Sequence, residues 1–366
     1  MRLAVLLIAA LTATAADHVI VYRETGRYGG WPANHGIWSW GDEILVGFSQ
    51  TYYKQRTPDH HQVDADKPEK PRLARSLDGG RTWKIEAPAG LIPPEQGGRQ
   101  PVALEHPMDF SQPGFAMTLR FKDTNQGASR MWFSTDKGHT WNGPFEFPLF
   151  GFTGVAARTD YLTRGKHEAL VFLTAAKSNG REGRPFCART TDGGLTWERL
   201  GFIGEEPKGF AIMPSTVRLS GDQLLTTVRV KGESGNWIDG YRSADGGRTW
   251  GSPERITETG TFSGNPPSLI RLRDGRLCLT YGFRSKPFGI FAKISKDSGR
   301  TWSAPITLRD DGAAWDLGYV RSVERPDGKV VTVYYYNDAP SSERFIAATL
   351  WDPAATVWDP AAERKN

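Results

Sequence analysis

Short apolar runs separated by turn-forming residues recur along almost the whole chain. Each run either alternates or is continuously apolar, as half-buried and fully buried strands are. The clearest runs are residues 18–22, 115–121, 129–133, 223–230, 276–282, 289–294, 318–323, 329–336 and 344–350. They repeat in one order: a short strand, a turn, an apolar strand, a loop and a further strand. The pattern predicts an all-β chain built from repeated units.

One eight-residue pattern, Ser/Thr-x-Asp-x-Gly-x-Thr-Trp, occurs five times. Its copies begin at Ser76, Ser134, Thr190, Ser243 and Ser295, and their aspartates lie 52 to 58 residues apart. Self-similarity at such a period is typical of a repeat array. We therefore expect about one four-stranded blade for each copy.

The repeated pattern, called the box below, has the chemistry of a tight turn between two strands. Its Asp can accept hydrogen bonds from the backbone N–H groups that follow, and its Gly allows positive φ. The Thr hydroxyl offers a second local bond, and the Trp can pack between neighbouring units. We therefore assign all five box aspartates to the scaffold and none to catalysis. They are Asp78, Asp136, Asp192, Asp245 and Asp297.

The box resembles the Asp-box, or BNR repeat, of the sialidase-like β-propeller superfamily, and the resemblance covers nearly all of the chain after residue 16. It implies a propeller, and the units predict six blades although there are only five boxes. A sixth unit of three strands follows the last box, and the strand at residues 18–22 belongs to no blade of its own. We expect this N-terminal strand to complete the last blade. It would close the ring, protect the sheet edges and remove the hairpin in which a sixth box would lie.

The first residues predict an exported protein. A basic start, an apolar run at residues 3–11 and small residues after it resemble a secretory signal peptide. We expect residues 1–16 to be this signal peptide and residues 17–366 to be one secreted or periplasmic domain without a membrane span. The net charge of +5 is scattered among acidic residues, which does not favour nucleic-acid binding. Cys187 and Cys278 are expected to be buried and unpaired.

Propeller geometry brings the starts of inner strands and the ends of second strands to one mouth of the central channel. Arg120, Arg229 and Arg284 each end a second strand, and a guanidinium binds a carboxylate bidentately. Such a cluster would suit an acidic sugar, whereas the alternative is that each arginine pairs with a nearby Asp or Glu. The resemblance implies that Arg229 and Arg284 are carboxylate-binding arginines. It also implies that Tyr319 is the Tyr nucleophile of sialidases, and the alternative for Tyr319 is a packed channel aromatic.

The first unit has a long polar connection at residues 50–71. A charged loop at the mouth is a natural source of a general acid, and Asp64 and Asp59 are its leading carboxylates. The alternative is a solvated surface loop. His60 and His61 do not predict a metal, because adjacent histidines point apart on an extended chain. No metal and no cofactor are expected.

The chain departs from the sialidase pattern at two positions. Asn34 and His35 stand where the first carboxylate-binding arginine is expected, and Met213-Pro214-Ser215 stands in place of the activating glutamate. Arg321 adds a charge close to the position of the nucleophile. His35 could act as a general acid or base on a different sugar, or it could be a hydrogen-bonded channel histidine.

Three functions are compatible with the sequence. We favour an exported glycoside hydrolase that removes a terminal acidic sugar, in which the arginines bind the carboxylate, a loop aspartate protonates the leaving oxygen and Tyr319 attacks. A lyase or a glycosidase centred on His35 is the second, and a non-catalytic glycan-binding propeller is the third. The expected partner is a glycan or glycoconjugate, and the sequence predicts no oligomeric state.

Overall fold

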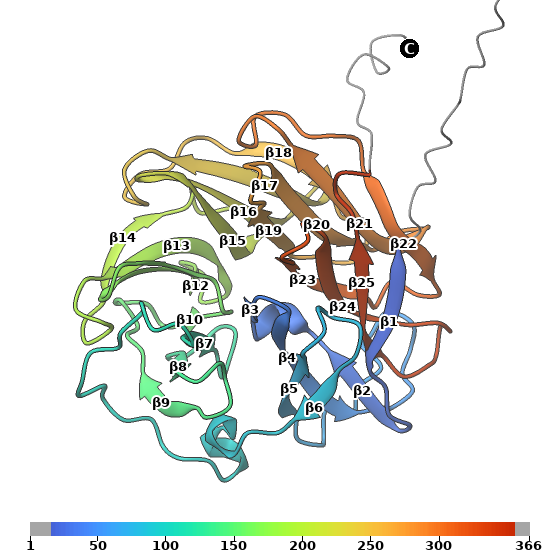
Figure 1. The fold of residues 1–366 in the computed structure, drawn as a ribbon, viewed down its shortest axis with the longest axis horizontal. Helices are drawn as coiled ribbons and strands as arrows, with labels where there is room; N and C mark the ends of the chain where they lie inside the picture. Colours follow the sequence, from blue (N-terminus) through green and yellow to red (C-terminus); the bar gives the residue numbers. More distant parts are fainter. Residues whose placement is uncertain (1–15, 356–366) are drawn as a thin grey trace, which may run out of the picture.

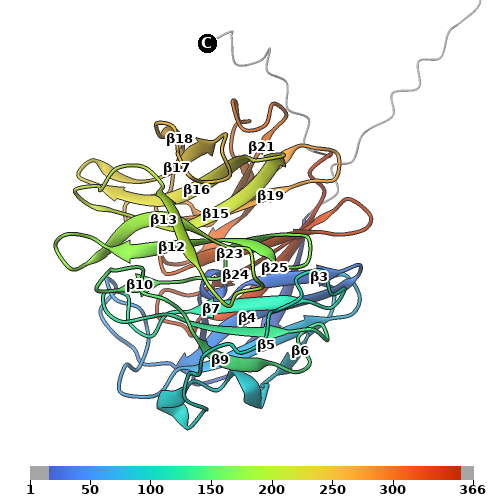
Figure 2. The ribbon, with the colours of Figure 1, turned by 90° about the vertical axis from the view of Figure 1, so that its left-hand side faces the viewer.

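The computed structural model describes residues 16–355 as an all-β ring of six blades. Figure 1 shows the ring down its axis and Figure 2 shows it from the side. The predicted six-bladed propeller is therefore confirmed. Residues 1–15 of the predicted signal peptide lie outside the described residues. Between residues 16 and 355, no helix is long and apolar enough to cross a membrane.

The blades are numbered in chain order, and the first three are antiparallel sheets. The first contains β2 (Arg27–Gly30), β3 (Ile37–Trp40), β4 (Glu43–Tyr52), β5 (Lys70–Ser76) and β6 (Lys84–Glu86). The second contains β7 (Ala116–Arg120), β8 (Arg130–Ser134) and β9 (Asn142–Glu146). The third contains β10 (Val155–Ala156), β11 (Tyr161–Arg164), β12 (Glu168–Ala176), β13 (Glu182–Thr190) and β14 (Glu198–Phe202). Three 3-10 turns lie between these strands: η1 (Pro32–Asn34), η2 (Ala89–Leu91) and η3 (Pro94–Gln96).

The last three blades each have four strands. The fourth contains β15 (Phe210–Ser220), β16 (Gln223–Gly232), β17 (Gly235–Ser243) and β18 (Glu254–Glu258). The fifth contains β19 (Pro267–Arg271), β20 (Leu277–Phe283), β21 (Phe288–Ser295) and β22 (Ile306–Gly312). The sixth contains β23 (Gly318–Glu324), β24 (Val330–Tyr336), β25 (Phe345–Trp351) and β1 (Asp17–Tyr22).

The N-terminal strand closes the ring, as predicted. β1 pairs antiparallel with β25, with Asp17 opposite Leu350 and Ile20 opposite Ala347. In Figure 1 the blue strand β1 accordingly lies beside the red strand β25. Because the outer strand of this blade comes from the other end of the chain, no hairpin follows β25, and the blade has no box.

All five box turns share the same hydroxyl–Gly and Asp–Thr hydrogen bonds, whereas the indole bond of the Trp is not formed in the third box. In the first, the Ser76 hydroxyl accepts the Gly80 N–H at 2.8 Å, while Asp78 accepts the N–H of Thr82 at 2.9 Å and its hydroxyl at 2.7 Å. The Trp83 indole donates to the Gly80 carbonyl at 2.9 Å. The same Asp–Thr contacts recur at Asp136, Asp192, Asp245 and Asp297. Each aspartate is thus bound within its own turn, as the sequence predicts.

The second blade differs from the sequence prediction of an inner strand beginning near residues 106–109. Within the described residues its sheet has only β7, β8 and β9. Three prolines fall within residues 101–113, and proline cannot donate to a strand ladder. The segment bonds instead to the third blade, where the Met108 N–H donates to the Gly193 carbonyl at 2.8 Å.

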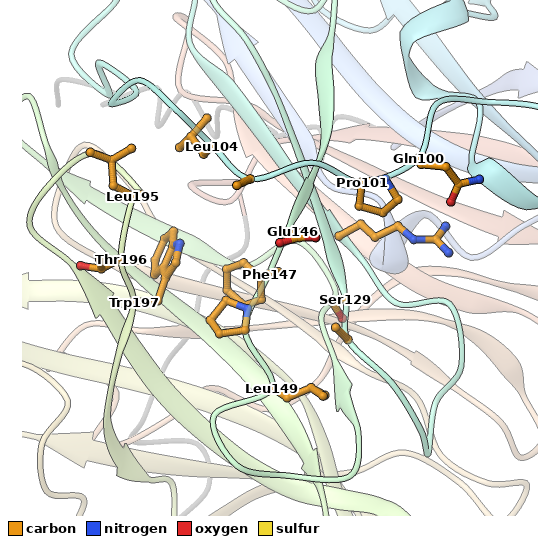
Figure 3. Close-up of a pocket in the computed structure, with 15 residues that line it drawn as sticks. Gln100, Pro101, Leu104, Ser129, Glu146, Phe147, Leu149, Leu195, Thr196 and Trp197 are labelled. Atoms are coloured by element: carbon orange, nitrogen blue, oxygen red, sulfur yellow. The ribbon is translucent and has the colours of Figure 1, made fainter.

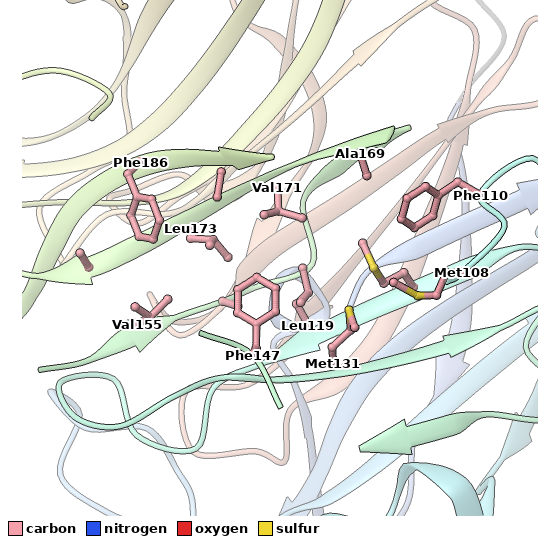
Figure 4. Close-up of a cluster of buried hydrophobic side chains, with 14 of the residues drawn as sticks. Met108, Phe110, Leu119, Met131, Phe147, Val155, Ala169, Val171, Leu173 and Phe186 are labelled. Atoms are coloured by element: carbon pink, nitrogen blue, oxygen red, sulfur yellow. The ribbon is translucent and has the colours of Figure 1, made fainter. Parts of the chain in front are cut away.

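The apolar core is divided among the spaces between neighbouring blades. Figure 4 shows the cluster between the second and third blades, in which Met131, Leu119 and Phe186 are fully buried. Met108 and Phe110 from the irregular segment belong to the same cluster. Burying a side chain of this size contributes about 1.5–3 kcal/mol, so the second blade keeps its packing although it lacks an inner strand.

The two cysteines are buried in different blades. Cys187 lies in β13 and Cys278 in β20, and both are unpaired. This arrangement confirms the sequence prediction.

Candidate functional site

Four residues in or near the inner strands have left-handed backbone conformations. They are Trp31 (φ 55°), Met213 (φ 56°), Ser263 (φ 57°) and Tyr319 (φ 49°). This conformation costs a residue with a Cβ about 1–2 kcal/mol, and such strain gathers at functional sites. The pairing register also shifts at Met213 and at Tyr319, and bulges of this kind redirect side chains. The two side chains meet Ala33 of η1 in one cluster that joins three blades.

Tyr319 lies among arginines from three other blades. The Arg229 Nη1 donates to its hydroxyl at 2.9 Å, and the Arg284 Cζ lies 5.5 Å from its ring centroid. Arg158, the third arginine, pairs with Glu182. Burial opposes ionisation of the phenol, but Arg229, Arg284 and Arg158 outweigh it and hold the pKa of Tyr319 below its ordinary value. The three guanidinium groups therefore make the phenol easier to ionise than a free tyrosine.

Arg229 and Arg284 are buried without a carboxylate. Their exposed fractions are 4% and 1%. Arg229 Nε donates to the Ser263 carbonyl at 3.1 Å, and Arg284 donates to the Leu317 carbonyl at 3.1 Å and to the Tyr335 hydroxyl at 2.6 Å. Neither forms an ion pair with an Asp or Glu within residues 16–355. The alternative of ordinary rim ion pairs does not describe these two arginines.

The expected activating carboxylate is replaced by a thioether. Met213 Sδ lies 3.9 Å from the Arg229 Nη1. A glutamate beside Tyr319 would accept the phenol proton. In this chain Arg229 donates a hydrogen bond to the Tyr319 hydroxyl instead, so the group next to the phenol oxygen is a cation. The electrostatics around Tyr319 therefore come from guanidinium groups.

A second charged group lies next to this cluster. Asp316 is 0% exposed and accepts the Tyr335 hydroxyl at 2.8 Å and the Arg344 Nε at 3.2 Å. The His61 ring reaches it from the loop at residues 50–71, with Nδ1 at 2.6 Å from the Asp316 Oδ1. Burial opposes ionisation of Asp316, but His61 and the nearby arginines hold its pKa well below the ordinary value.

Sequence reasoning missed this pair as a site. The two residues are 255 positions apart, and His61 was considered only as a neighbour of His60. The available signal was a histidine in the long mouth loop together with an aspartate at the start of an inner strand.

The two loop carboxylates predicted as acids lie outside the arginine cluster. Asp64 pairs with Lys54 Nζ at 3.3 Å, and the Asp59 side chain is 67% exposed beside His60. Burial opposes ionisation of Asp64, but Lys54 keeps its pKa below the ordinary value, and a bond from Thr57 does the same for Asp59. A general acid near neutral pH needs a raised pKa, so these surroundings favour the ionised forms instead.

His35, Asn34 and Arg120 line a separate cavity of about 370 Å³ between the first and second blades. The His35 Nε2 lies 2.8 Å from the Ser49 hydroxyl, which also binds Glu69. Burial and two neighbouring arginines hold the pKa of His35 well below its ordinary value. The imidazole is therefore neutral, and it is bonded away from the Tyr319 cluster.

Arg321 connects blades at the axis. Its Nη2 donates to the carbonyls of Ala33 and Thr159, both at 2.7 Å. Burial raises the pKa of the neighbouring Asp160 to about 7 against the opposing charge of Arg321. These contacts fit a role in holding the blades together.

A larger cavity lies elsewhere. It has a volume of about 700 Å³ and is lined by Glu146, Phe147, Leu195 and Trp197, between the end of the second blade and the third box (Figure 3). Its walls contain none of the predicted site residues. We assign it no part in the chemistry.

Six blades, five Asp-box turns and a Tyr–Arg cluster at the mouth define a sialidase-like β-propeller. Residues 72–332 match the BNR repeat-like domain family, and the chain belongs to this family. A search of the curated proteins found no match.

Solved structures with the same fold include proteins of different activity. A crystal structure of a protein of unknown function from Dyadobacter fermentans has a TM-score of 0.69 and 21% identity, covering 91% of this chain and 97% of its own. Trypanosoma rangeli sialidase in complex with sialic acid has a TM-score of 0.58 and 13% identity, covering 93% of this chain and 59% of its own. Penicillium chrysogenum α-L-arabinanase complexed with arabinobiose has a TM-score of 0.59 and 14% identity, covering 94% and 100%. At these identities the likeness supports the fold alone.

Proposed function

We propose that this protein is an exported, sialidase-like glycoside hydrolase that removes a terminal acidic sugar from a glycan. Arg229 and Arg284 bind the sugar carboxylate, and Tyr319 is the nucleophile. The proposal of export rests on the signal-peptide pattern in the sequence.

The observation that carries the proposal is the burial of two cations that form no direct ion pair with an Asp or Glu among the described residues. An ionised group removed from water is strongly destabilising unless it is paired. Arg229 and Arg284 come from different blades and both lie beside Tyr319. Hydrogen bonds to carbonyl and hydroxyl groups satisfy part of each guanidinium but supply no counter-charge to Arg229, and Asp316, whose charge acts on Arg284, is paired directly with Arg344. A carboxylate from the substrate would supply it.

Tyr319 suits nucleophilic attack because the arginines stabilise its phenolate. A phenol requires a base or a cationic field to react near neutral pH, and this chain has the cationic field. The sequence favours Asp64 and Asp59 of the loop at residues 50–71 as the proton donor for the leaving oxygen, but both lie outside the arginine cluster and both have pKa values below the ordinary value.

The thioether at Met213 favours elimination as a second candidate. In a uronic acid, the Tyr319 phenolate could take the proton next to a carboxylate that the arginines neutralise. The bond to the leaving oxygen would then break and a carbon–carbon double bond would form. This route needs no carboxylate beside Tyr319.

The test is a screen of the purified protein with a chromogenic sialoside, a glucuronide and a neutral glucoside. We expect hydrolysis of an acidic glycoside, and Tyr319→Phe should lower kcat by at least about 10³-fold. Tyr241→Phe, a buried tyrosine of β17, is the matched control and should keep the wild-type rate.

Other outcomes of the screen separate the alternatives. A product that absorbs light through a new carbon–carbon double bond would show that the reaction is elimination and not hydrolysis. Binding of acidic sugars without turnover would indicate a glycan-binding propeller. An unchanged rate in Tyr319→Phe would contradict the nucleophile.

A further inference from the structure

The His61 imidazole is held in place at the mouth. Its ring lies between two tryptophans, with ring centroids 5.5 Å from Trp31 and 5.2 Å from Trp315. The Trp31 contact is edge-on, at an interplanar angle of 90°. The His61 side chain remains 39% exposed, whereas the Asp316 that it contacts is 0% exposed. One side of the ring is therefore fixed by protein and the other side is accessible.

The partner of Nδ1 determines what the other nitrogen can do. Asp316 is an ionised carboxylate and can only accept hydrogen bonds, so the Nδ1 of His61 carries a proton. Nε2 is then a base when the ring is neutral and an acid when the ring is protonated. Within residues 16–355, Nε2 has no hydrogen-bond partner. It is thus available to a bound substrate.

The carboxylate of Asp316 cannot turn away from His61. The Tyr28 hydroxyl donates to it at 3.2 Å, and Tyr335 and Arg344 donate from two further positions. A carboxylate that holds one imidazole nitrogen and is itself fixed by several donors fixes both the tautomer and the orientation of the ring.

A chain of hydrogen bonds connects His61 to the proposed carboxylate anchor. Tyr335 donates to Asp316 and accepts from Arg284 Nη2 at 2.6 Å. The Tyr335 ring also lies 6.0 Å from the Tyr319 ring, centroid to centroid. His61 and Tyr319 therefore flank the same Arg284–Tyr335 pair.

We propose that His61, oriented by Asp316, is the general acid and base of the reaction. This inference rests on the proposed hydrolase function and replaces the loop aspartates as proton donors. Asp316 is a positioning residue, because it acts through His61.

The first step transfers one proton and exchanges one bond. Protonated His61 gives its Nε2 proton to the leaving oxygen while the glycosidic bond breaks toward that oxygen. The Tyr319 phenolate forms the new bond to the anomeric carbon. In the second step neutral His61 takes a proton from water, the water oxygen bonds to that carbon, and the bond to Tyr319 breaks to restore the phenolate.

Loss of a general acid slows substrates whose leaving oxygen needs a proton much more than substrates whose leaving oxygen does not. We would compare a nitrophenyl glycoside, whose leaving oxygen needs little protonation, with a sugar-linked substrate of the same acidic sugar. His61→Gln should lower kcat/KM on the sugar-linked substrate by about 10²–10⁴-fold and on the nitrophenyl substrate by less than about tenfold. His60→Gln is the control, because His60 is the neighbouring histidine and its side chain contacts Thr57 and Asp59 instead of the Asp316 carboxylate.

Asp316→Asn tests the positioning role with the same two substrates. The charged and titratable groups that surround the pair are Arg284, Arg344, Tyr28 and Tyr335, and none of them changes in this variant. Without the carboxylate at Nδ1 the tautomer and orientation of the His61 ring are no longer fixed, so kcat/KM should fall more on the sugar-linked substrate than on the nitrophenyl substrate, whereas a purely structural loss would lower both alike. If Asp316→Asn does not fold, the comparison of the two substrates in His61→Gln alone tests whether His61 is the general acid.

The outcomes separate this inference from the proposed function. Equal losses on both substrates, or no loss on the sugar-linked one, would overturn the role of His61 while hydrolysis stands. A wild-type protein without activity on any acidic glycoside overturns the proposed hydrolase function first.

Discussion

The box turns and the mouth lie at opposite ends of the same blades and are built in opposite ways. Each box closes within eight residues, and the same set of hydrogen bonds recurs five times around the ring. At the mouth the contacts do not repeat from blade to blade, and single contacts join residues up to 288 positions apart. The repeated end therefore determines the fold, and the variable end can carry chemistry.

The comparison also separates two uses of charge. At the boxes each aspartate finds its partners in the same turn, so its charge is satisfied locally. At the mouth neither Arg229 nor Arg284 forms a direct ion pair with an Asp or Glu among the described residues. A charge that the protein itself leaves unpaired points to a ligand, whereas a charge paired within its turn points to the scaffold.

The largest expected effect comes from removing a mouth cation. Arg229→Met should weaken binding of an acidic monosaccharide by about 30-fold or more, because losing a buried, charged hydrogen-bond partner costs about 2–5 kcal/mol. Stability should change little, since the variant also removes an unpaired buried charge. Titration calorimetry with glucuronic and sialic acid, together with Tm, measures both.

If Arg229→Met bound acidic sugars as tightly as the wild type, the difference between mouth arginines that bind a ligand and box aspartates that serve the scaffold would not hold. The control is Arg189→Met, since Arg189 lies in β13 and pairs with Glu198 at 3.2 Å. That variant should bind the same sugars as the wild type.

The next effect concerns the boxes. Asp78→Asn should lower stability by about 1–3 kcal/mol, because charged hydrogen bonds to Thr82 are lost or weakened. We expect Tm to fall by several degrees while kcat stays unchanged. Asp297→Asn should behave alike, and the double variant should show additive losses because the boxes are independent. A fall in kcat without a fall in Tm would contradict the division between the two ends.

The smallest effect is the response of the boxes to pH. Burial opposes ionisation of Asp78 and Asp245, but the Thr and Ser bonds in each turn lower both pKa values to about 2. Their folded pKa values lie below the unfolded value of about 3.9. The stabilisation is therefore complete above about pH 5 and is lost as the pH falls through 4 toward 2. Tm measured against pH should fall less steeply in Asp78→Asn, and an identical slope would contradict this origin.

Two kinds of feature could be predicted from the sequence: turns that form through contacts within a few residues, and strand assignments that follow from counting the strands of each blade. The boxes are local, and the strand at residues 18–22 was assigned by noting that the last blade lacked an outer strand. The missing inner strand of the second blade was not predicted, although its prolines were visible, because regular repetition favoured a strand there. Packing of Met108 and Phe110 replaces what the ladder would have contributed.

The candidate site was predicted only in part. Arg229, Arg284 and Tyr319 came from a resemblance, and the three side chains meet. Arg120 looked equivalent in sequence but lines another cavity with His35, because the ends of second strands in different blades face different neighbours. The contact of His61 with Asp316 depends on how a long loop folds across the mouth, and no periodicity encodes that path.

The pairing of β1 with β25 also orders events during synthesis. β1 leaves the ribosome before the other described strands, yet it forms its ladder with a strand made more than 320 residues later. Five box-bearing units can hence acquire their turns while the last blade still waits for its edge. The blade that carries Tyr319 and Asp316 is completed last, so the mouth is assembled only when the whole ring has been made.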